Sequence, residues 1–270
     1  MAEKPRHKLG MMQGRVRPER LDAYQIFPSS AWRNELREIG SIGFDFVELL
    51  YDRRLECVSK MADAPPYDAK SVCADFLTSV SALTSPAAFV DALSEAIGWA
   101  RGRGADVLVV PFFHENTLSS TADLRQVLGL LSEAGADEMA GDCALALEAT
   151  LPAEGLLAAF DEHSFESVKL CYDLGNARFS NLRPEEELLV LDNLVGHIHV
   201  KDRSVNGPNV PLGTGDVDFE ACFRSLDRIG YDGLLTLETH YGDSPADEAA
   251  RNLRFIRSIQ ERTLSCAYSS

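Results

Sequence analysis

Eight short apolar runs alternate with stretches of helical periodicity, and this alternation constrains the fold more than any other feature of the chain. Polar residues end the runs and lie about 25–40 positions apart, which is the length of one strand–helix unit. The runs are KLGMMQG, FDFVELL, SVCADF, DVLVVPFF, CALALEAT, VKLCYDLG, GHIHVKD and GLLTLET. The clearest helical stretches are WRNELREIGSIG, PAAFVDALSEAIGWARGRG, TADLRQVLGLLSEAG, RPEEELLVLDNLVG, FEACFRSLDRIG and DEAARNLRFIRSIQER.

Eight evenly spaced units favour a closed α/β structure, the TIM (β/α)8 barrel, over an open doubly wound sheet, which is the competing architecture. No low-complexity linker interrupts the chain, so we expect a single domain over residues 1–270. The helix between the second and third runs, around ECVSKMAD, is weakly indicated. Ser85 before Pro86 reads as a helix N-cap, and Pro184 before three glutamates reads as a helix start.

Composition restricts the partners and the compartment. The net charge of −16 repels phosphate backbones and anionic lipid, so we expect neither nucleic acid nor membrane as a partner. The N-terminus MAEKPRHKLG lacks an apolar signal core and no run reaches the length of a membrane span, which predicts a cytoplasmic protein. The six cysteines form no CxxC pair, and Cys73, Cys143 and Cys171 lie inside apolar runs, as reduced core residues do.

Side-chain alternation selects the residues that point into the barrel. In CALALEAT, Glu148 shares a face with two alanines, while leucines occupy the other face. In GHIHVKD, His197 and His199 share the inward face, with His199 nearer the carboxyl end of the strand. Asp173 closes the run VKLCYD, and Glu238 closes GLLTLE. We therefore expect Glu148, Asp173, His199 and Glu238 at one level of the barrel mouth, where active sites of this fold lie.

Three carboxylates and an imidazole cannot all stay ionised in a closed pocket without a cation. A divalent metal resolves the conflict, and three oxygen ligands with one nitrogen suit Mn²⁺ best, with Mg²⁺, Co²⁺ or Zn²⁺ as alternatives. Taken singly, each group has a plainer reading: a strand-end glutamate is commonly a salt-bridge partner, and His197 is more typical of a core histidine than of a ligand.

Several motifs resemble the xylose isomerase-like TIM-barrel superfamily, the sugar phosphate isomerase/epimerase group. They are GMMQGRV followed by YQIFPSSAWRNELREIGSIGFDFVELLYD near the N-terminus, then YDLGNA, GHIHVKD and LGTGDVDFEACFRSLDRIGYDGLLTLET. The resemblance implies metal ligands at Glu148, Asp173, His199 and Glu238, with the two glutamates also acting as the acid/base pair. It implies a substrate-binding glutamate six residues after the first ligand, which is Glu154 here.

The resemblance also implies a small-molecule carbohydrate substrate. Asn176 stands where the branch that acts on free ketoses has histidine, so we expect a substrate that carries phosphate or carboxylate. Lys201, Arg203 and the turn Gly213–Gly215 are the expected contacts of that anion, His197 or Lys201 could hold a substrate oxygen, and Arg15 is a further candidate contact.

The function that the resemblance implies is a metal-dependent sugar or sugar-phosphate isomerase or 3-epimerase that acts through an enediolate. Two alternatives stay open: a lyase of the inosose dehydratase type on the same metal site, and a non-catalytic sugar-binding barrel subunit. A nuclease like endonuclease IV would need extra histidines after the seventh strand, and SVNGPNVPLGTGDVD has none. A homodimer is compatible with the sequence, which leaves the oligomeric state open.

Overall fold

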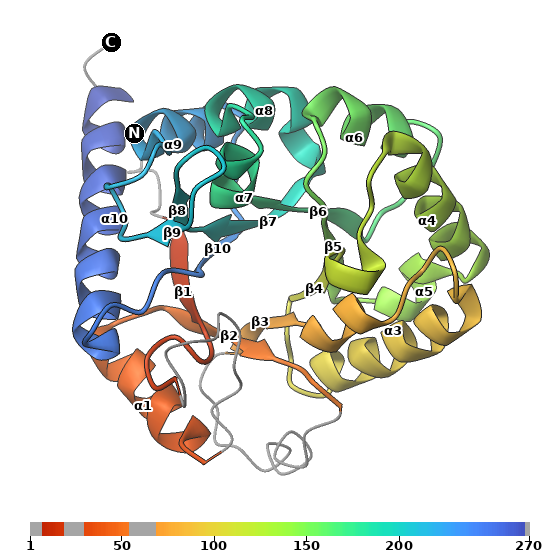
Figure 1. Cartoon of the computed structure of the whole chain (residues 1–270), viewed down its shortest axis with the longest axis horizontal. Helices are drawn as coiled ribbons and strands as arrows, with labels where there is room; N and C mark the ends of the chain where they lie inside the picture. The colour runs from red at the N-terminus through yellow and green to blue at the C-terminus, as the bar shows by residue number, and fades with distance from the viewer. Residues whose placement is uncertain (1–6, 19–29, 54–68, 268–270) are drawn as a thin grey trace.

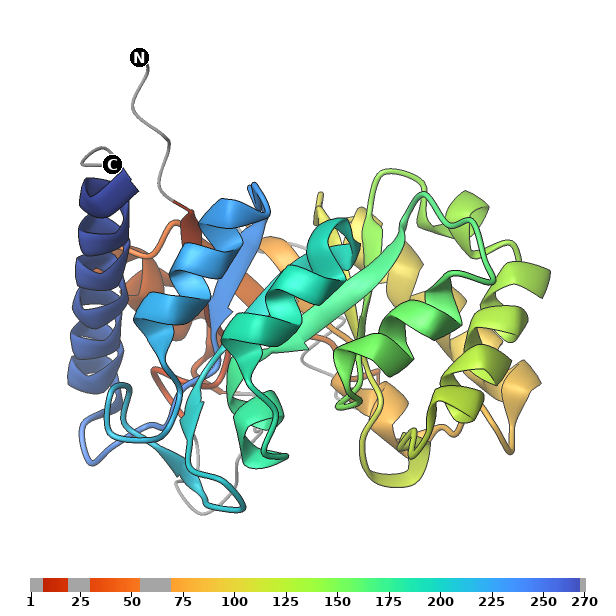
Figure 2. The same ribbon diagram turned by 90° about the horizontal axis from the view of Figure 1, so that it is seen from above.

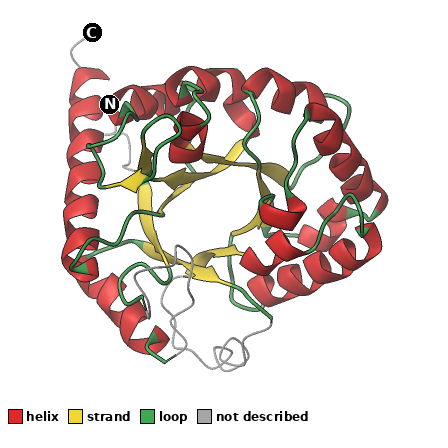
Figure 3. Ribbon diagram, viewed as in Figure 1, coloured by secondary structure: helices red, strands yellow, loops and turns green. Residues whose placement is uncertain are grey.

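Eight parallel strands close into a barrel inside a ring of helices (Figures 1 and 3). The computed structural model describes residues 7–18, 30–53 and 69–267. Around the barrel the strands follow the order β1, β10, β7, β6, β5, β4, β3, β2, with β2 pairing back to β1. Their bounds are β1 Lys8–Met12, β2 Phe46–Leu50, β3 Ala69–Cys73, β4 Val107–Pro111, β5 Ala144–Glu148, β6 Val168–Asp173, β7 Val195–Val200 and β10 Leu234–Leu237. The fold is the (β/α)8 barrel that the spacing of the runs predicts.

The helices match the six expected stretches and include elements that periodicity did not indicate. The α-helices are α1 Trp32–Ile42, α3 Pro86–Arg101, α4 Thr121–Glu133, α5 Ala136–Ala140, α6 Ala153–Phe160, α7 Leu174–Phe179, α8 Pro184–Leu191, α9 Phe219–Arg228 and α10 Pro245–Ala267. Short 3-10 helices are η2 Asp75–Ser79, η3 His114–Asn116 and η4 Asp192–Leu194. The sequence AEGLLAAF of α6 is short and apolar almost throughout, so its helical period is hard to tell from a buried strand in the sequence. The weakly indicated helix around ECVSKMAD lies outside the described residues.

Some helices begin with a side chain that caps the first turn, and others do not. Helix α3 begins at Pro86 as expected, but Ser85 makes no capping hydrogen bond with its side chain. By contrast, the side chains of Ser120 and Asp218 accept from backbone N–H groups in the first turns of α4 and α9. Proline at the first position of α3 leaves one fewer backbone donor to satisfy there.

The hydrophobic core lies between the strands and the surrounding helices. In β7 the outward side chains of Ile198 and Val200 are fully buried against this layer, and the inward ones are His197 and His199. Cys73, Cys143 and Cys171 are buried free cysteines, as expected: Cys143 packs in this layer, whereas Cys73 and Cys171 lie on the inner side of the barrel. Among the described helices, none combines the length and the apolar character that a bilayer crossing requires.

A small antiparallel hairpin follows β7 and projects from one end of the barrel (Figure 2). It consists of β8 Asp202–Arg203 and β9 Asn209–Val210. Because β8 starts two residues after β7 ends, the hairpin lies at the carboxyl end of the barrel strands. It therefore borders the end of the barrel at which enzymes of this fold bind their substrates.

Candidate metal centre and substrate cavity

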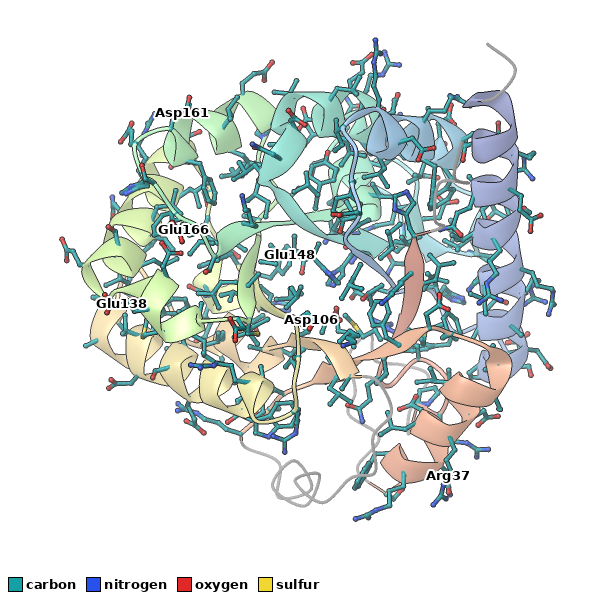
Figure 4. All side chains as sticks on the ribbon, turned by 180° about the vertical axis from the view of Figure 1, so that it is seen from behind. Arg37, Asp106, Glu138, Glu148, Asp161 and Glu166 are labelled. Carbon is teal, nitrogen blue, oxygen red and sulfur yellow. The ribbon has the colours of Figure 1, made fainter. Side chains whose placement is uncertain are left out.

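Four side chains meet at the carboxyl ends of β5, β6, β7 and β10. Donor atoms of Glu148, Asp173, His199 and Glu238 all lie within 4.8 Å of one another, and the four residues are buried. From His199 Nδ1 the distances are 3.5 Å to Glu148 Oε2, 3.9 Å to Asp173 Oδ2 and 3.3 Å to Glu238 Oε2. Figure 4 shows Glu148 inside the ring of helices, whereas Asp161, Glu138 and Arg37 lie at its outer edge. The structure thus brings together the four residues that alternation selects.

The His199 ring is held by its other nitrogen. Its Nε2 lies 2.9 Å from Glu48 Oε1, in the middle of β2. Its Nδ1 faces the three carboxylates and makes no well-aligned hydrogen bond with any described residue. A buried nitrogen aimed at carboxylate oxygens, with its opposite nitrogen bonded to another carboxylate, is the arrangement of a metal-binding histidine. The donor set therefore fits a divalent cation, with one nitrogen and three oxygens as ligands.

Two positively charged side chains contact this cluster. Lys201 Nζ lies 2.7 Å from Asp173 Oδ2 and 2.9 Å from Glu238 Oε2. Arg15 Nη2 lies 3.1 Å from Glu238 Oε1, and its guanidinium stacks over the Tyr241 ring. Glu238 is thus flanked by two positive charges, and both of its oxygens are engaged.

The carboxylates respond differently to these surroundings. Burial opposes ionisation of Glu238, but Lys201, His199 and Arg15 together hold its pKa well below the usual range. Burial raises the pKa of Asp173, and the charges of Glu148 and Glu238 raise it further against the effect of Lys201. Asp173 is therefore hard to ionise, although the neighbouring Glu238 ionises easily. This difference indicates that negative charge is crowded at the site, and a divalent cation would relieve it.

Asn176 connects the cluster to Arg203. Its backbone N–H donates to Asp173 Oδ1 at 2.7 Å, and its side-chain Nδ2 donates to Glu148 Oε1 at 3.3 Å. Its Oδ1 accepts from Arg203 Nη1 at 3.2 Å. The guanidinium of Arg203 also lies 3.9 Å from the centre of the Phe179 ring and donates to the carbonyl of Gly207. Asn176 therefore links an acid/base candidate to a charged group of the hairpin.

A cavity of about 510 Å³ opens above the cluster. The donors Glu148, His199 and Glu238 lie at its base, together with Lys201. Its walls, among the described residues, include Met12, Cys73, Pro111, Phe113, Leu118, Asn176, Phe179 and Arg203. This volume lies in the range of small-molecule sites. Among the described residues of its lining, polar ones outnumber apolar ones, which suits a polar ligand.

Two expected substrate contacts lie away from this cavity. His197 is fully buried one pleat deeper than His199, and its Nε2 lies 2.8 Å from Glu48 Oε2 and 3.1 Å from Thr236 Oγ1. Glu154 is exposed in the first turn of α6. Neither residue lines the cavity, and nor does Arg15, the third expected contact outside its lining. Asn176, Lys201 and Arg203 do line it.

The turn Gly213–Gly215 is not the anion-binding loop that the sequence suggests. The N–H groups of Gly213 and Gly215 donate to Asp202 Oδ2 at 2.8 and 2.9 Å, and that of Thr214 donates to Pro211 O at 3.1 Å. The expectation that these amides bind a substrate phosphate is therefore wrong. An internal carboxylate occupies the position, and a glycine-rich triplet alone does not reveal it.

Sequence reasoning missed Glu48 and the full surroundings of His199. Glu48 sits between apolar residues in FVELL, and only its shared parity with Phe46 indicates an inward side chain. The Cys171 thiol also lies within 4.8 Å of donor atoms of Glu148 and His199. Burial raises the pKa of Cys171, and the cations proposed for this site that prefer oxygen, Mn²⁺ and Mg²⁺, favour the carboxylates over the thiol.

Part of the chain is similar in sequence to curated proteins. Two curated relatives are L-ribulose-5-phosphate 3-epimerases called UlaE. The Escherichia coli protein is 41% identical over 69 residues, which are 23% of this chain and 24% of the relative. The Salmonella paratyphi A protein is 33% identical over 88 residues, which are 32% of this chain and 31% of the relative. The chain thus matches about a quarter to a third of the length of these relatives.

Solved structures match over nearly the whole chain. A structure of L-ribulose 3-epimerase superposes with a TM-score of 0.72 at 18% identity, covering 97% of both chains. A xylose isomerase-like protein from Mycobacterium smegmatis in complex with magnesium gives a TM-score of 0.68 at 18% identity, covering 96% of this chain and 97% of the other. At such identities these structures support the fold alone.

The sequence profile of the xylose isomerase-like TIM barrel matches residues 36–259. This range begins in α1, includes all four residues of the donor cluster and ends in α10. The chain therefore belongs to the xylose isomerase-like TIM-barrel family.

Proposed function

We propose that this protein is a divalent-metal-dependent sugar isomerase or 3-epimerase that acts through an enediolate. One observation carries the proposal: Glu148 and Glu238 approach the same nitrogen, His199 Nδ1, from β5 and β10, which β6 and β7 separate in the barrel. Two carboxylates that flank one site from separated strands can remove a proton from one side of a bound carbon and return it elsewhere. The matched regions of the L-ribulose-5-phosphate 3-epimerases support the same class of reaction.

The metal ligands in this proposal are Glu148, Asp173, His199 and Glu238, and Mn²⁺ suits them best, with Mg²⁺, Co²⁺ or Zn²⁺ as alternatives. Bound there, the cation would stabilise the negative charge that develops when a proton leaves the carbon next to a carbonyl. Glu148 and Glu238 are the acid/base pair. Lys201 and Arg15 keep Glu238 ionised and positioned, and Asn176 orients Glu148 through its amide.

The substrate in this proposal carries an anionic group that Arg203 binds. In the described part of the chain, no carboxylate lies within ion-pair distance of Arg203, whose contacts are Asn176, Gly207 and the Phe179 ring. A guanidinium held by neutral groups on a cavity wall is suited to phosphate or carboxylate. Lys201, in contrast, is engaged by two carboxylates of the donor cluster.

The reaction class is tested by incubating the Mn²⁺-loaded protein with phosphorylated ketoses, free ketoses, inositol derivatives and hydroxypyruvate in deuterated water. We expect deuterium to enter the carbon next to the carbonyl without loss of water, as NMR would show. Loss of water would instead identify a lyase of the dehydratase type. Binding without any exchange would identify a sugar-binding subunit.

The substrate charge is tested with Arg203→Gln and Arg203→Lys. We expect Arg203→Gln to raise KM for a phosphorylated substrate at least about tenfold, the loss of one charged hydrogen bond, with a smaller effect on kcat. Arg203→Lys should recover part of this loss. Equal KM changes for the phosphorylated and the free sugar would contradict an anion site at Arg203.

A further inference from the structure

Glu48 is an ionisable residue of the barrel interior that the proposed reaction does not use directly. It lies in β2 with none of its side chain exposed. Four hydrogen-bonding groups surround its carboxylate. Oε1 lies 2.9 Å from His199 Nε2, and Oε2 lies 2.8 Å from His197 Nε2 and accepts from Ser71 Oγ at 2.7 Å and Thr236 Oγ1 at 2.9 Å. Such a set satisfies a buried carboxylate without any metal of its own.

The surroundings of the carboxylate favour its charged form. Ser71 and Thr236 donate to Oε2, and the imidazoles of His197 and His199 make the other two contacts, so four groups able to donate face one carboxylate and stabilise it as an anion. An ionised carboxylate only accepts hydrogen bonds, so each facing Nε2 must carry a proton. When the His199 ring is neutral, its lone pair is therefore on Nδ1, the nitrogen that faces Glu148, Asp173 and Glu238.

The remaining donors fix Glu48 itself. Ser71 lies on β3, and Thr236 and His197 lie on β10 and β7, so three strands besides β2 hold one oxygen of the carboxylate in place. The other oxygen is left for His199. The rings of His197 and His199 are 5.3 Å apart and nearly perpendicular, so each presents its Nε2 to a different oxygen of the same group.

From this arrangement we infer that Glu48 is a positioning residue that fixes the orientation and tautomer of His199, so that Nδ1 is the metal-binding atom. The inference depends on the metal site of the proposed function. The inference also assigns a role to His197. This residue helps to hold Glu48 and does not reach the substrate cavity. A negative charge on the far side of the ring further strengthens the imidazole as a ligand.

The first test is the Mn²⁺ affinity of Glu48→Gln, measured by titration calorimetry without substrate. If the glutamine carbonyl faces His199, the negative charge is lost. If the amide NH₂ faces His199, the ring must carry its proton on Nδ1, which blocks the ligand atom. We expect the affinity to fall about 10–100-fold in either case, as for the loss of an outer partner of a ligand histidine. Glu48→Asp keeps the charge but withdraws it from the ring, so it should also bind Mn²⁺ more weakly.

Ser71→Ala is the matched control, because it removes a donor to Oε2 and leaves the Oε1 bond to His199. It should change the Mn²⁺ affinity by no more than a few-fold. Circular dichroism and cooperative melting identify any variant that fails to fold. Absence of Mn²⁺ binding in the unmodified protein would remove the metal site and both proposals with it. Unchanged affinity in folded Glu48→Gln would overturn this inference alone.

A second measurement needs no variant at Glu48. In the Mg²⁺-loaded protein with ¹⁵N-labelled histidine, we expect the spectrum of His199 to show a proton on Nε2 and none on Nδ1. Signals of the two interior histidines are distinguished with His197→Gln. A proton on Nδ1 of His199 would refute the assigned role of Glu48 even if every Glu48 variant failed to fold.

Discussion

The two halves of the barrel differ in what they place at its mouth. The later strands, β5, β6, β7 and β10, supply Glu148, Asp173, His199 and Glu238, which form the donor cluster. The earlier strands, β1, β3 and β4, line the same cavity with Met12, Cys73 and Pro111. The earlier half contributes none of these four residues but contacts two of them, His199 through Glu48 and Glu238 through Arg15. One half thus provides the groups that we propose to be reactive, and the other provides part of the cavity lining and the contacts that hold two of those groups.

The largest expected effect tests the later half. Glu148→Gln and Glu238→Gln should each lower turnover by about 10²–10⁴-fold, because each removes a proton-transfer group. Turnover is measured by deuterium exchange on the substrate that the screen identifies. Glu166→Gln is the control, since Glu166 is exposed in the segment that precedes β6, at the opposite end of that strand from Asp173. Near-normal turnover in either cluster variant would contradict a mechanism with two glutamates.

The two histidines of β7 provide the next comparison within one strand. His199→Ala should lower the Mn²⁺ affinity more than about 100-fold, because it deletes a ligand and not only a ligand's partner. His197→Ala should retain the metal and lower the free energy of unfolding by about 1–3 kcal/mol, since it removes a donor from the buried Glu48 carboxylate. Calorimetric titration and thermal unfolding of both variants separate these outcomes. Metal loss in His197→Ala alone would mean that the depth assignment on β7 is wrong.

The two halves of the barrel can also be compared by adding one methyl group at a glycine in each half. An added Cβ at Gly10 would lie 2.2 Å from the Phe46 ring, and one at Gly175 would lie 2.4 Å from Lys201 Cγ. Both alanine variants should lower the free energy of unfolding by about 1–3 kcal/mol, because each overfills a packed site. Only Gly175→Ala should also reduce turnover, since it displaces the lysine that contacts Asp173 and Glu238.

Gly98→Ala is the control for both glycine variants. Nothing lies within 4 Å of an added Cβ at this position of α3, so the change should raise the free energy of unfolding by up to about 1 kcal/mol. Urea unfolding and the exchange assay measure the two properties separately. Equal turnover losses in Gly10→Ala and Gly175→Ala would show that the two halves do not differ in the way described.

The sequence predicted the barrel and the donor cluster because both follow from patterns along the chain. Evenly spaced runs indicate the strand–helix units, and alternation within a run indicates which side chains point inward. Glu148 and His199 could be selected in this way because each lies at or near the end of a strand. The cluster then follows from closure of the barrel, which brings the carboxyl ends of its strands together.

The supporting contacts could not be predicted because they depend on pairings across the barrel. Glu48 and His199 are separated by 151 positions, and Arg15 and Glu238 by 223. A single glutamate in FVELL gives no sign that two histidines of another strand meet it. The same limit applies to the turn Gly213–Gly215, whose anion partner, Asp202, belongs to the chain itself.

The carboxylate of Asp202 affects whether the segment after the hairpin becomes ordered before or during ligand binding. It accepts from the backbone N–H groups of Gly213, Gly215 and Val217, so the segment that follows the hairpin is ordered when the chain folds. The conformational entropy of that segment is therefore lost during folding and not during association with a ligand. Arg203, the neighbour of Asp202 in β8, would thus meet the anionic group of the proposed substrate from a strand that is already in place.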